Sequence, residues 1–145
     1  MYSQVLLPTD GSGAAETAVE AGLELAVQFD AAVHALYVID SRFVTTEYDL
    51  AVEKAEREAE AALDRVGELG ESAGVAAEKQ LRTGIPHEEI LDAIDSHGVD
   101  VVVMGTHGRS SLDRLVHLGS VTERVVRSAP VHVVTVPVGE RTGNR

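Results

Sequence analysis

The sequence contains no cysteine and no tryptophan, and aromatic residues make up only 3% of its 145 positions. The absence of cysteine excludes disulfides, a thiolate zinc site and a cysteine nucleophile. Because aromatic side chains are scarce, we expect a core of Val, Leu, Ile and Ala, which suits a buried parallel sheet. The length fits one compact domain, and a hydrophobic content of 44% argues against wholesale disorder.

Positive charge is also scarce. The chain carries 12 Lys and Arg against 24 Asp and Glu, a net charge of −12, and its only lysines are Lys54 and Lys79. Such a surface repels nucleic acids and anionic lipids, so neither is an expected partner. It also repels ATP, which means that a nucleotide site must create its own local positive potential. The acidic, lysine-poor composition further leads to the hypothesis of a halophilic protein, adapted to high salt.

Nothing in the sequence resembles a targeting segment or a membrane span. Met1 to Gln4 lead directly into a strand-like segment, without a basic region followed by a long apolar run. No apolar stretch is long enough to cross a bilayer. We therefore expect a cytoplasmic protein with no membrane partner.

Strand-like and helix-like segments alternate along the chain. Apolar β-branched runs predict strands at 5–7, 33–39, 75–81, 100–104 and 131–136, and helical spacing predicts helices at 14–29, 47–72, 86–96 and 119–128. This alternation predicts an α/β fold: a single-domain, open, doubly wound parallel sheet of five strands in the order 3-2-1-4-5, which is Rossmann-like. The alternating segment 75–81 is expected at an edge and the Val-rich segment 100–104 in the centre. The domain is expected to span 1–138, with a polar tail at 139–145.

The segment from Gly105 to Thr122 has the composition of an anion cradle. Ligands of such sheets bind beyond the carboxyl ends of the strands at the switch point, here between the first and fourth strands, whose loops should face each other. Gly105 and Gly108 allow positive φ and close approach of a ligand, and Gly119-Ser120 begins a helix whose free N–H groups favour an anion. The other residues that could contribute are Ser110, Ser111, Thr122, Arg109 and Arg114. The simpler interpretation is that the glycines serve turn geometry and the hydroxyls cap the helix.

Known phosphate and nucleophile motifs do not fit. The P-loop needs a lysine after its second glycine, and this loop has none. Gly11-Ser12-Gly13 is a poor dinucleotide fingerprint, because Glu16 stands at the third glycine position and would oppose a pyrophosphate. No Ser–His–acid order is recognisable either, so we assign no catalytic residue.

Five segments resemble the universal stress proteins, in particular their ATP-binding branch. The segments are Val5 to Ser12, Val38 to Asp40, Gly84, Val103 to Arg109 and Gly119 to Val125. ATP-binding members carry two glycines separated by two residues, then nine residues, then Gly followed by Ser or Thr. Gly105, Gly108 and Gly119-Ser120 match, except that ten residues lie between Gly108 and Gly119. The extra residue, within Leu115 to Leu118, either bulges harmlessly or shifts Gly119-Ser120 away from the phosphates.

The resemblance implies a site for ATP or another adenine nucleotide, together with Mg²⁺ or Mn²⁺. Asp10 would lie near the ribose and adenine, Pro8 and Val38 would form walls of the adenine pocket, and Gly105 to Ser111 would wrap the phosphates. The full predicted set is Pro8, Thr9, Asp10, Val38, Met104, Gly105, His107, Gly108, Arg109, Ser110, Ser111, Gly119, Ser120, Val121 and Thr122.

Two residues of this set have alternative interpretations. Asp10 also suits a turn or a helix cap, and His107 either donates to a phosphate oxygen or is an exposed loop residue. The histidines interpreted as surface or strand-end residues, which form no metal cluster, are His34, His87, His97 and His132.

The resemblance implies an ATP-binding stress-response or signalling module with little or no hydrolysis. The alternatives are a slow ATPase and a dimeric interaction module of the same family that binds no nucleotide. A homodimer is also implied, and the last strand, Val131 to Val136, is a credible edge for antiparallel pairing of two subunits.

Overall fold

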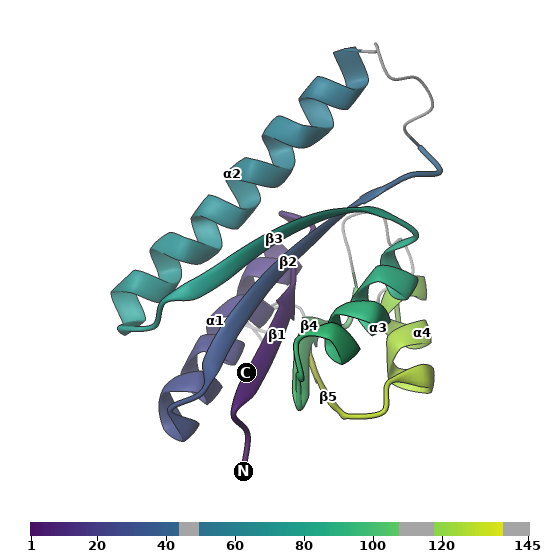
Figure 1. Cartoon of the computed structure of the whole chain (residues 1–145). Coiled ribbons are helices and arrows are strands. Elements are labelled where there is room, and N and C mark those ends of the chain that lie inside the picture. Colours follow the sequence, from purple (N-terminus) through teal and green to yellow (C-terminus); the bar gives the residue numbers. More distant parts are fainter. Residues whose placement is uncertain (44–49, 108–117, 138–145) are drawn as a thin grey trace, which may run out of the picture.

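A computed structural model of the chain describes residues 1–43, 50–107 and 118–137. Strands and helices alternate along them, and five strands form one parallel sheet in the order β3-β2-β1-β4-β5 (Figure 1). The strands are β1 (Gln4–Pro8), β2 (Ala32–Asp40), β3 (Ala77–Gly84), β4 (Val101–Gly105) and β5 (His132–Val136). The helices are α1 (Gly13–Phe29), α2 (Leu50–Ala73), α3 (Pro86–Ser96) and α4 (Ser120–Ser128). The predicted fold class and strand order are confirmed.

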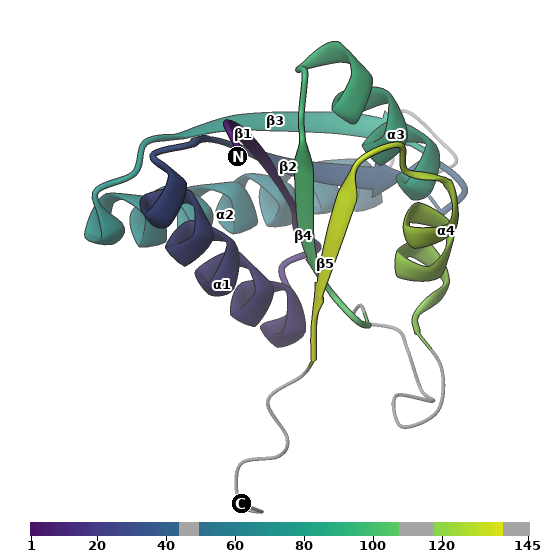
Figure 2. The ribbon, with the colours of Figure 1, turned by 90° about the horizontal axis from the view of Figure 1, so that it is seen from below.

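The sheet is covered on both faces. Figure 2 shows α1 and α2 on one face and α3 and α4 on the other. Alternate residues of each strand serve the two layers: Val5 and Leu7 of β1 pack with α1 and α2, whereas Leu6 packs with α3 and α4. All five residues of β4 are buried, as its Val-rich sequence predicts for a central strand.

The chain changes winding direction between β1 and β4. β1 pairs in parallel with β2 on one side, through Leu6↔His34, and with β4 on the other, through Leu6↔Val102. The carboxyl ends of β1 and β4 are therefore neighbours, and the predicted switch point is confirmed. No helix of the described ranges is long and apolar enough to cross a membrane.

Most element boundaries lie within one residue of the predicted ones, and the largest difference is in β3, which starts at Ala77 instead of residue 75. β3 continues to Gly84 instead of ending at Leu81, because its last residues keep their register with Val38 to Asp40 of β2. The described part of α2 starts at Leu50, and the predicted helix start at residue 47 lies outside the described ranges.

Candidate functional site

The loop after β1 is a tight turn that starts α1. The Asp10 carboxylate accepts a hydrogen bond from the Ser12 amide at 3.0 Å, and Gly11 has a φ of +82°, in the region that favours glycine. The Ser12 hydroxyl then accepts from the Ala15 amide at 3.1 Å and caps α1. Asp10 therefore forms the turn, and its place near a ribose stays a prediction.

Gly105, at the end of β4, lies against the first turn of α1. A Cβ atom added to it would stand 3.2 Å from the Ala14 carbonyl oxygen and 3.4 Å from that of His107. Gly105 is part of a strand and does not have the positive φ that the sequence suggested. Its small size instead lets the end of β4 approach α1, which brings the loops after β1 and β4 together.

The N-terminus of α4 is fixed to the end of β4 by two hydrogen bonds. The Gly119 amide donates to the Thr106 carbonyl at 2.8 Å, and the Thr122 hydroxyl donates to the Gly105 carbonyl, also at 2.8 Å. Gly119 is the N-cap residue, and it has no side chain that could cap the helix. Within the described part of the chain, no side chain accepts a hydrogen bond from the first-turn amides of α4, which begins at exposed Ser120.

Apolar residues of the predicted site lie on the face covered by α3 and α4. Met104 is 5% exposed and belongs to the core of that layer, and Val38 and Val121 are half-buried against it. Pro8 is buried at the end of β1. The predicted adenine walls thus share one face of the sheet with the α4 N-terminus.

His107 is buried, with only 7% of its surface exposed. Its Nδ1 lies 2.9 Å from the Thr106 hydroxyl. The interpretation of His107 as an exposed loop residue is therefore wrong, and a bond to phosphate stays a prediction. The predicted site residues that lie outside the described part of the chain are Gly108, Arg109, Ser110 and Ser111.

Arginines near the carboxyl ends of the strands are paired with carboxylates. Arg42 binds Asp40 at 2.7 Å, and its side chain lowers the pKa of that carboxyl, against a smaller opposite effect of burial. The sequence analysis missed this pair, although a spacing of two residues after a strand end is a visible signal. Arg65 of α2 binds Glu16 of α1 at 3.2 Å. Positive potential for an anion must therefore come chiefly from backbone amides or from residues such as Arg109.

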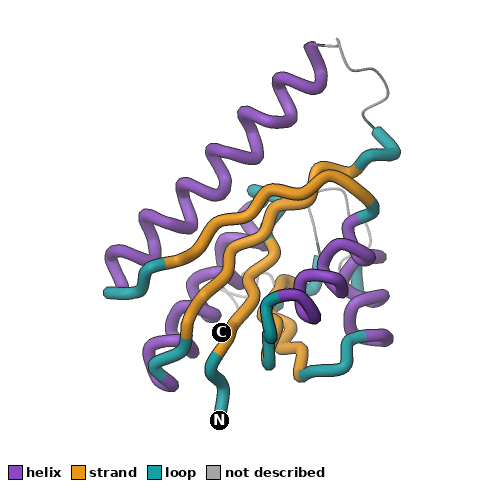
Figure 3. The backbone as a smooth tube through the Cα atoms, viewed as in Figure 1, coloured by secondary structure: helices purple, strands orange, loops and turns teal. Residues whose placement is uncertain are grey.

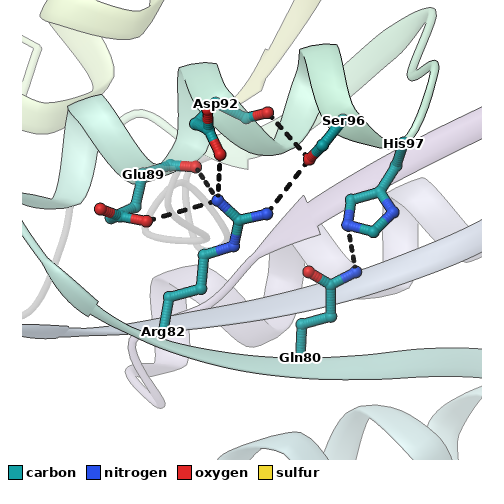
Figure 4. A network of polar contacts seen from close by, with 6 residues as sticks. All are labelled: Gln80, Arg82, Glu89, Asp92, Ser96 and His97. Atoms are coloured by element: carbon teal, nitrogen blue, oxygen red, sulfur yellow. Dashed lines mark hydrogen bonds and ion pairs between the residues drawn. The ribbon is translucent and has the colours of Figure 1, made fainter.

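Arg82 holds the edge strand β3 to α3. Its guanidinium contacts Asp92 at 2.7 Å, Glu89 at 3.3 Å and the Ser96 hydroxyl at 3.2 Å (Figure 4). A Cβ atom at Gly84 would stand 2.5 Å from a carboxylate oxygen of Glu89. Gly84, one of the residues that carries the family resemblance, thus makes room for this network.

His34 is buried near the start of β2, as the third of its nine residues, so it is not the surface residue that was one of its two interpretations. It is 8% exposed, its ring stacks on that of His97 at 5.0 Å, and its Nε2 lies 2.8 Å from the Gln4 amide oxygen. Burial lowers the pKa of His34, the nearby His97 lowers it further, and Glu78 opposes both. Across the described ranges, no three His, Asp or Glu side chains are arranged to hold a metal.

The chain is similar to known proteins over nearly its whole length. The universal stress protein family matches residues 1–137. Universal stress protein MJ0531 of Methanocaldococcus jannaschii is 37% identical, over 97% of this chain and 86% of its own. The solved structure of hypothetical protein MJ0577, from the same organism, has a TM-score of 0.84 at 33% identity and covers 94% of this chain and 96% of its own. Universal stress protein UspA from Lactobacillus plantarum has a TM-score of 0.80 at 30% identity, over 93% and 97% of the two chains. This chain therefore belongs to the universal stress protein family.

Proposed function

We propose that this protein binds an adenine nucleotide, in the first place ATP, and acts as a cytoplasmic stress-response or signalling module. The observation that carries the proposal is the N-terminus of α4. No side chain of the described residues caps its first-turn amides, and the bonds from Gly119 and Thr122 fix it beside the switch point. An uncapped helix N-terminus at this position suits a phosphate.

The proposed pose runs from an apolar wall to this helix. Val38 and Pro8 flank the adenine, Asp10 contacts the ribose, and the phosphates lie against the loop that starts at Gly105 and the first turn of α4. Mg²⁺ or Mn²⁺ accompanies the triphosphate and offsets the repulsion from a chain of net charge −12.

Solved structures with the same fold contain adenine nucleotides. They are a universal stress protein in complex with cAMP (TM-score 0.76, 22% identity), one from Archaeoglobus fulgidus with dAMP (0.71, 21%) and one from Arabidopsis thaliana with AMP bound (0.71, 19%). At these identities the likeness concerns the fold alone. The likeness supports the proposal because the same fold accommodates an adenine nucleotide in those proteins.

Two measurements test the proposal. Small molecules released by heat from one sample of the purified protein are assayed for adenine nucleotide. Calorimetry on a second sample then measures the binding of ATP, ADP and AMP in the presence of Mg²⁺. Ser120→Ala removes a hydroxyl at the α4 N-terminus and should weaken ATP binding by about tenfold, since a bond to a charged group contributes roughly 1.5–3 kcal/mol. The matched control is Ser128→Ala, at the other end of the same helix, which should change nothing. Gly108→Val should abolish phosphate binding.

The absence of both copurified nucleotide and measurable ATP binding would overturn the proposal. It would leave the family's interaction-module alternative. Multiple-turnover phosphate release on the scale of seconds would instead identify an ATPase. We expect little or no turnover, because no residue of the described site is placed as a catalytic base.

We also propose a homodimer formed by antiparallel pairing of β5 edges. The two sheet edges differ in charge: β3 carries Glu78, Lys79 and Arg82, whereas β5 contains no Asp, Glu, Lys or Arg. Charged side chains protect an edge from pairing, so β5 is the edge open to a second subunit. Val134, 39% exposed at its centre, would lie near the twofold axis.

Light scattering tests the assembly. We expect the mass of a dimer for the wild-type chain and of a monomer for Val134→Lys, which places two like charges opposite each other. Leu81→Lys, at the β3 edge, is the matched control because Leu81 has a similar exposure of 40%. A wild-type monomer, or a dimer unaffected by Val134→Lys, would exclude the β5 interface.

A further inference from the structure

A groove made of two hollows lies between α1 and α2, which cover the same face of the sheet (Figures 2 and 3). Its upper part, of about 350 Å³, begins at Thr9 and Gly11 and is lined further down by Leu69 of α2. Its lower part, of about 810 Å³, also includes Leu69 and continues to Val27. Leu69 lines both parts.

The accessible floor of the groove is apolar. Leu25 of α1 and Leu69 of α2 line it half-buried, whereas Val19 and Leu23 are almost fully buried in the core. Towards the lower end, Val27 is 50% exposed, so a large apolar side chain faces solvent on the groove wall. Exposed apolar surface inside a concave feature indicates a contact site for another molecule.

The α1 wall of the groove is acidic. Glu16, Glu20 and Glu24 follow one another at i, i+4 spacing and line it, and α1 contains no Lys or Arg. Glu16 has a cationic partner in Arg65, whereas no ion pair of the described residues involves Glu20 or Glu24. Like charges at this spacing disfavour the helix, so the row is not explained by the stability of α1 itself.

We propose that this groove docks a basic amphipathic helix of another protein. An apolar stripe of such a helix would contact the floor, and its Lys or Arg side chains would pair with Glu20 and Glu24. α1 has 17 residues and is about 25 Å long, so the groove accommodates a helix of some four to five turns. A helix of a second copy of this chain is a poor occupant, because α1 and α2, the helices of sufficient length, are themselves acidic.

The proposal is independent of the nucleotide site. The upper end of the groove reaches the loop of Thr9 and Gly11, but its apolar floor and acidic row lie on the face opposite to Val38 and Met104. Loss of nucleotide binding would therefore leave the docking proposal intact, and the reverse also holds.

Fluorescence anisotropy with a labelled synthetic peptide tests the docking. The probe is a Leu/Ala/Lys helix of roughly 18 residues with one leucine stripe, and the control peptide has the same composition in shuffled order. The striped peptide should bind at least about tenfold more tightly than the shuffled one, because only it presents an apolar face with its charges. Circular dichroism establishes a salt concentration at which every variant is folded.

Matched variants separate the groove from general electrostatic attraction. The double variant Glu20→Gln/Glu24→Gln should weaken binding of the striped peptide by about tenfold. The double variant Glu56→Gln/Glu60→Gln removes the same charge elsewhere on the acidic surface and should change the affinity by less than about twofold. Val27→Ser should also weaken binding, and Val126→Ser, at an apolar residue of α4 that is 44% exposed, should not.

Equal binding of the two peptides, or equal effects of the two charge-removing pairs, would overturn the proposal, because attraction would then be non-specific. Backbone amide shifts confined to α1 and α2 on titration with the striped peptide would support it. An oligomer of the free protein that Val27→Ser dissociates would overturn it in favour of a self-interface.

Discussion

The bond from the Thr122 hydroxyl to the Gly105 carbonyl should hold the α4 N-terminus in place. Its length is 2.8 Å, and Thr122 is only 4% exposed. Thr122→Val keeps the shape of the side chain but removes the donor and leaves a buried carbonyl with one partner fewer. The expected loss is about 1–2 kcal/mol, within the range for a broken buried hydrogen bond. For a chain of this length, that corresponds to a fall of roughly 3–7 °C in Tm.

Hydrogen exchange locates the effect. The Gly119 amide, bonded to the Thr106 carbonyl in the wild type, should exchange roughly 5–30 times faster in Thr122→Val if the helix end opens locally, as that loss of free energy implies. Thr122→Ser is the control: it retains the hydroxyl and loses a methyl group, so Tm falls by a similar amount while the Gly119 amide stays protected. If Thr122→Val leaves both Tm and Gly119 exchange unchanged, the bond does not hold the helix end.

Three further predictions concern the core and the surface. Because burial lowers the pKa of His34 below its ordinary value of 6.5, the unfolded chain takes up the proton first, and stability is lost as pH falls from about 6.5 through the folded pKa. Urea midpoints between pH 7.5 and 5.5 should show this slope, which His34→Leu should flatten and His132→Gln should not. Gly22→Ala should destabilise by about 1–2 kcal/mol, because its Cβ would meet Leu7 and Val103 where α1 packs on the sheet. Gly67→Ala, facing only the flexible end of Lys79, should instead stabilise by up to about 1 kcal/mol. If the chain is adapted to salt, its thermal midpoint should rise steadily from dilute buffer to molar KCl, and an unchanged midpoint would refute the halophilic hypothesis.

Sequence patterns were sufficient for the fold because each reports a local property. The Val-rich sequence of β4 indicates a strand buried on both faces, and the alternation in β3 indicates a strand with one exposed face. The order of these strands and the helices between them leaves few possible topologies. The ends of elements were predicted less well. β3 extends to Gly84 because its last residues pair with Val38 to Asp40 of β2, a non-local term that turn propensity does not contain.

The candidate site was located by sequence but interpreted only in part. Gly105 was chosen for its freedom towards a ligand, and the structure adds a different reason, the approach of the Ala14 backbone. Thr122 was chosen as a phosphate donor, and its hydroxyl already donates to Gly105. Both roles are compatible with a nearby ligand, but they mean that a glycine or hydroxyl in a loop does not by itself distinguish a binding group from a structural one.

By itself, the sequence determined the element order, the parallel sheet, the switch point between β1 and β4 and the family resemblance, since all of these follow from local periodicity and short motifs. Only the tertiary structure decided which distant groups meet. It buried His34 against His97, paired Arg82 with Glu89 and Asp92, and left an acidic, apolar-floored groove between α1 and α2. The physical reason is that a periodic pattern specifies which face of an element is apolar, whereas the side chains that face one another depend on how the layers pack.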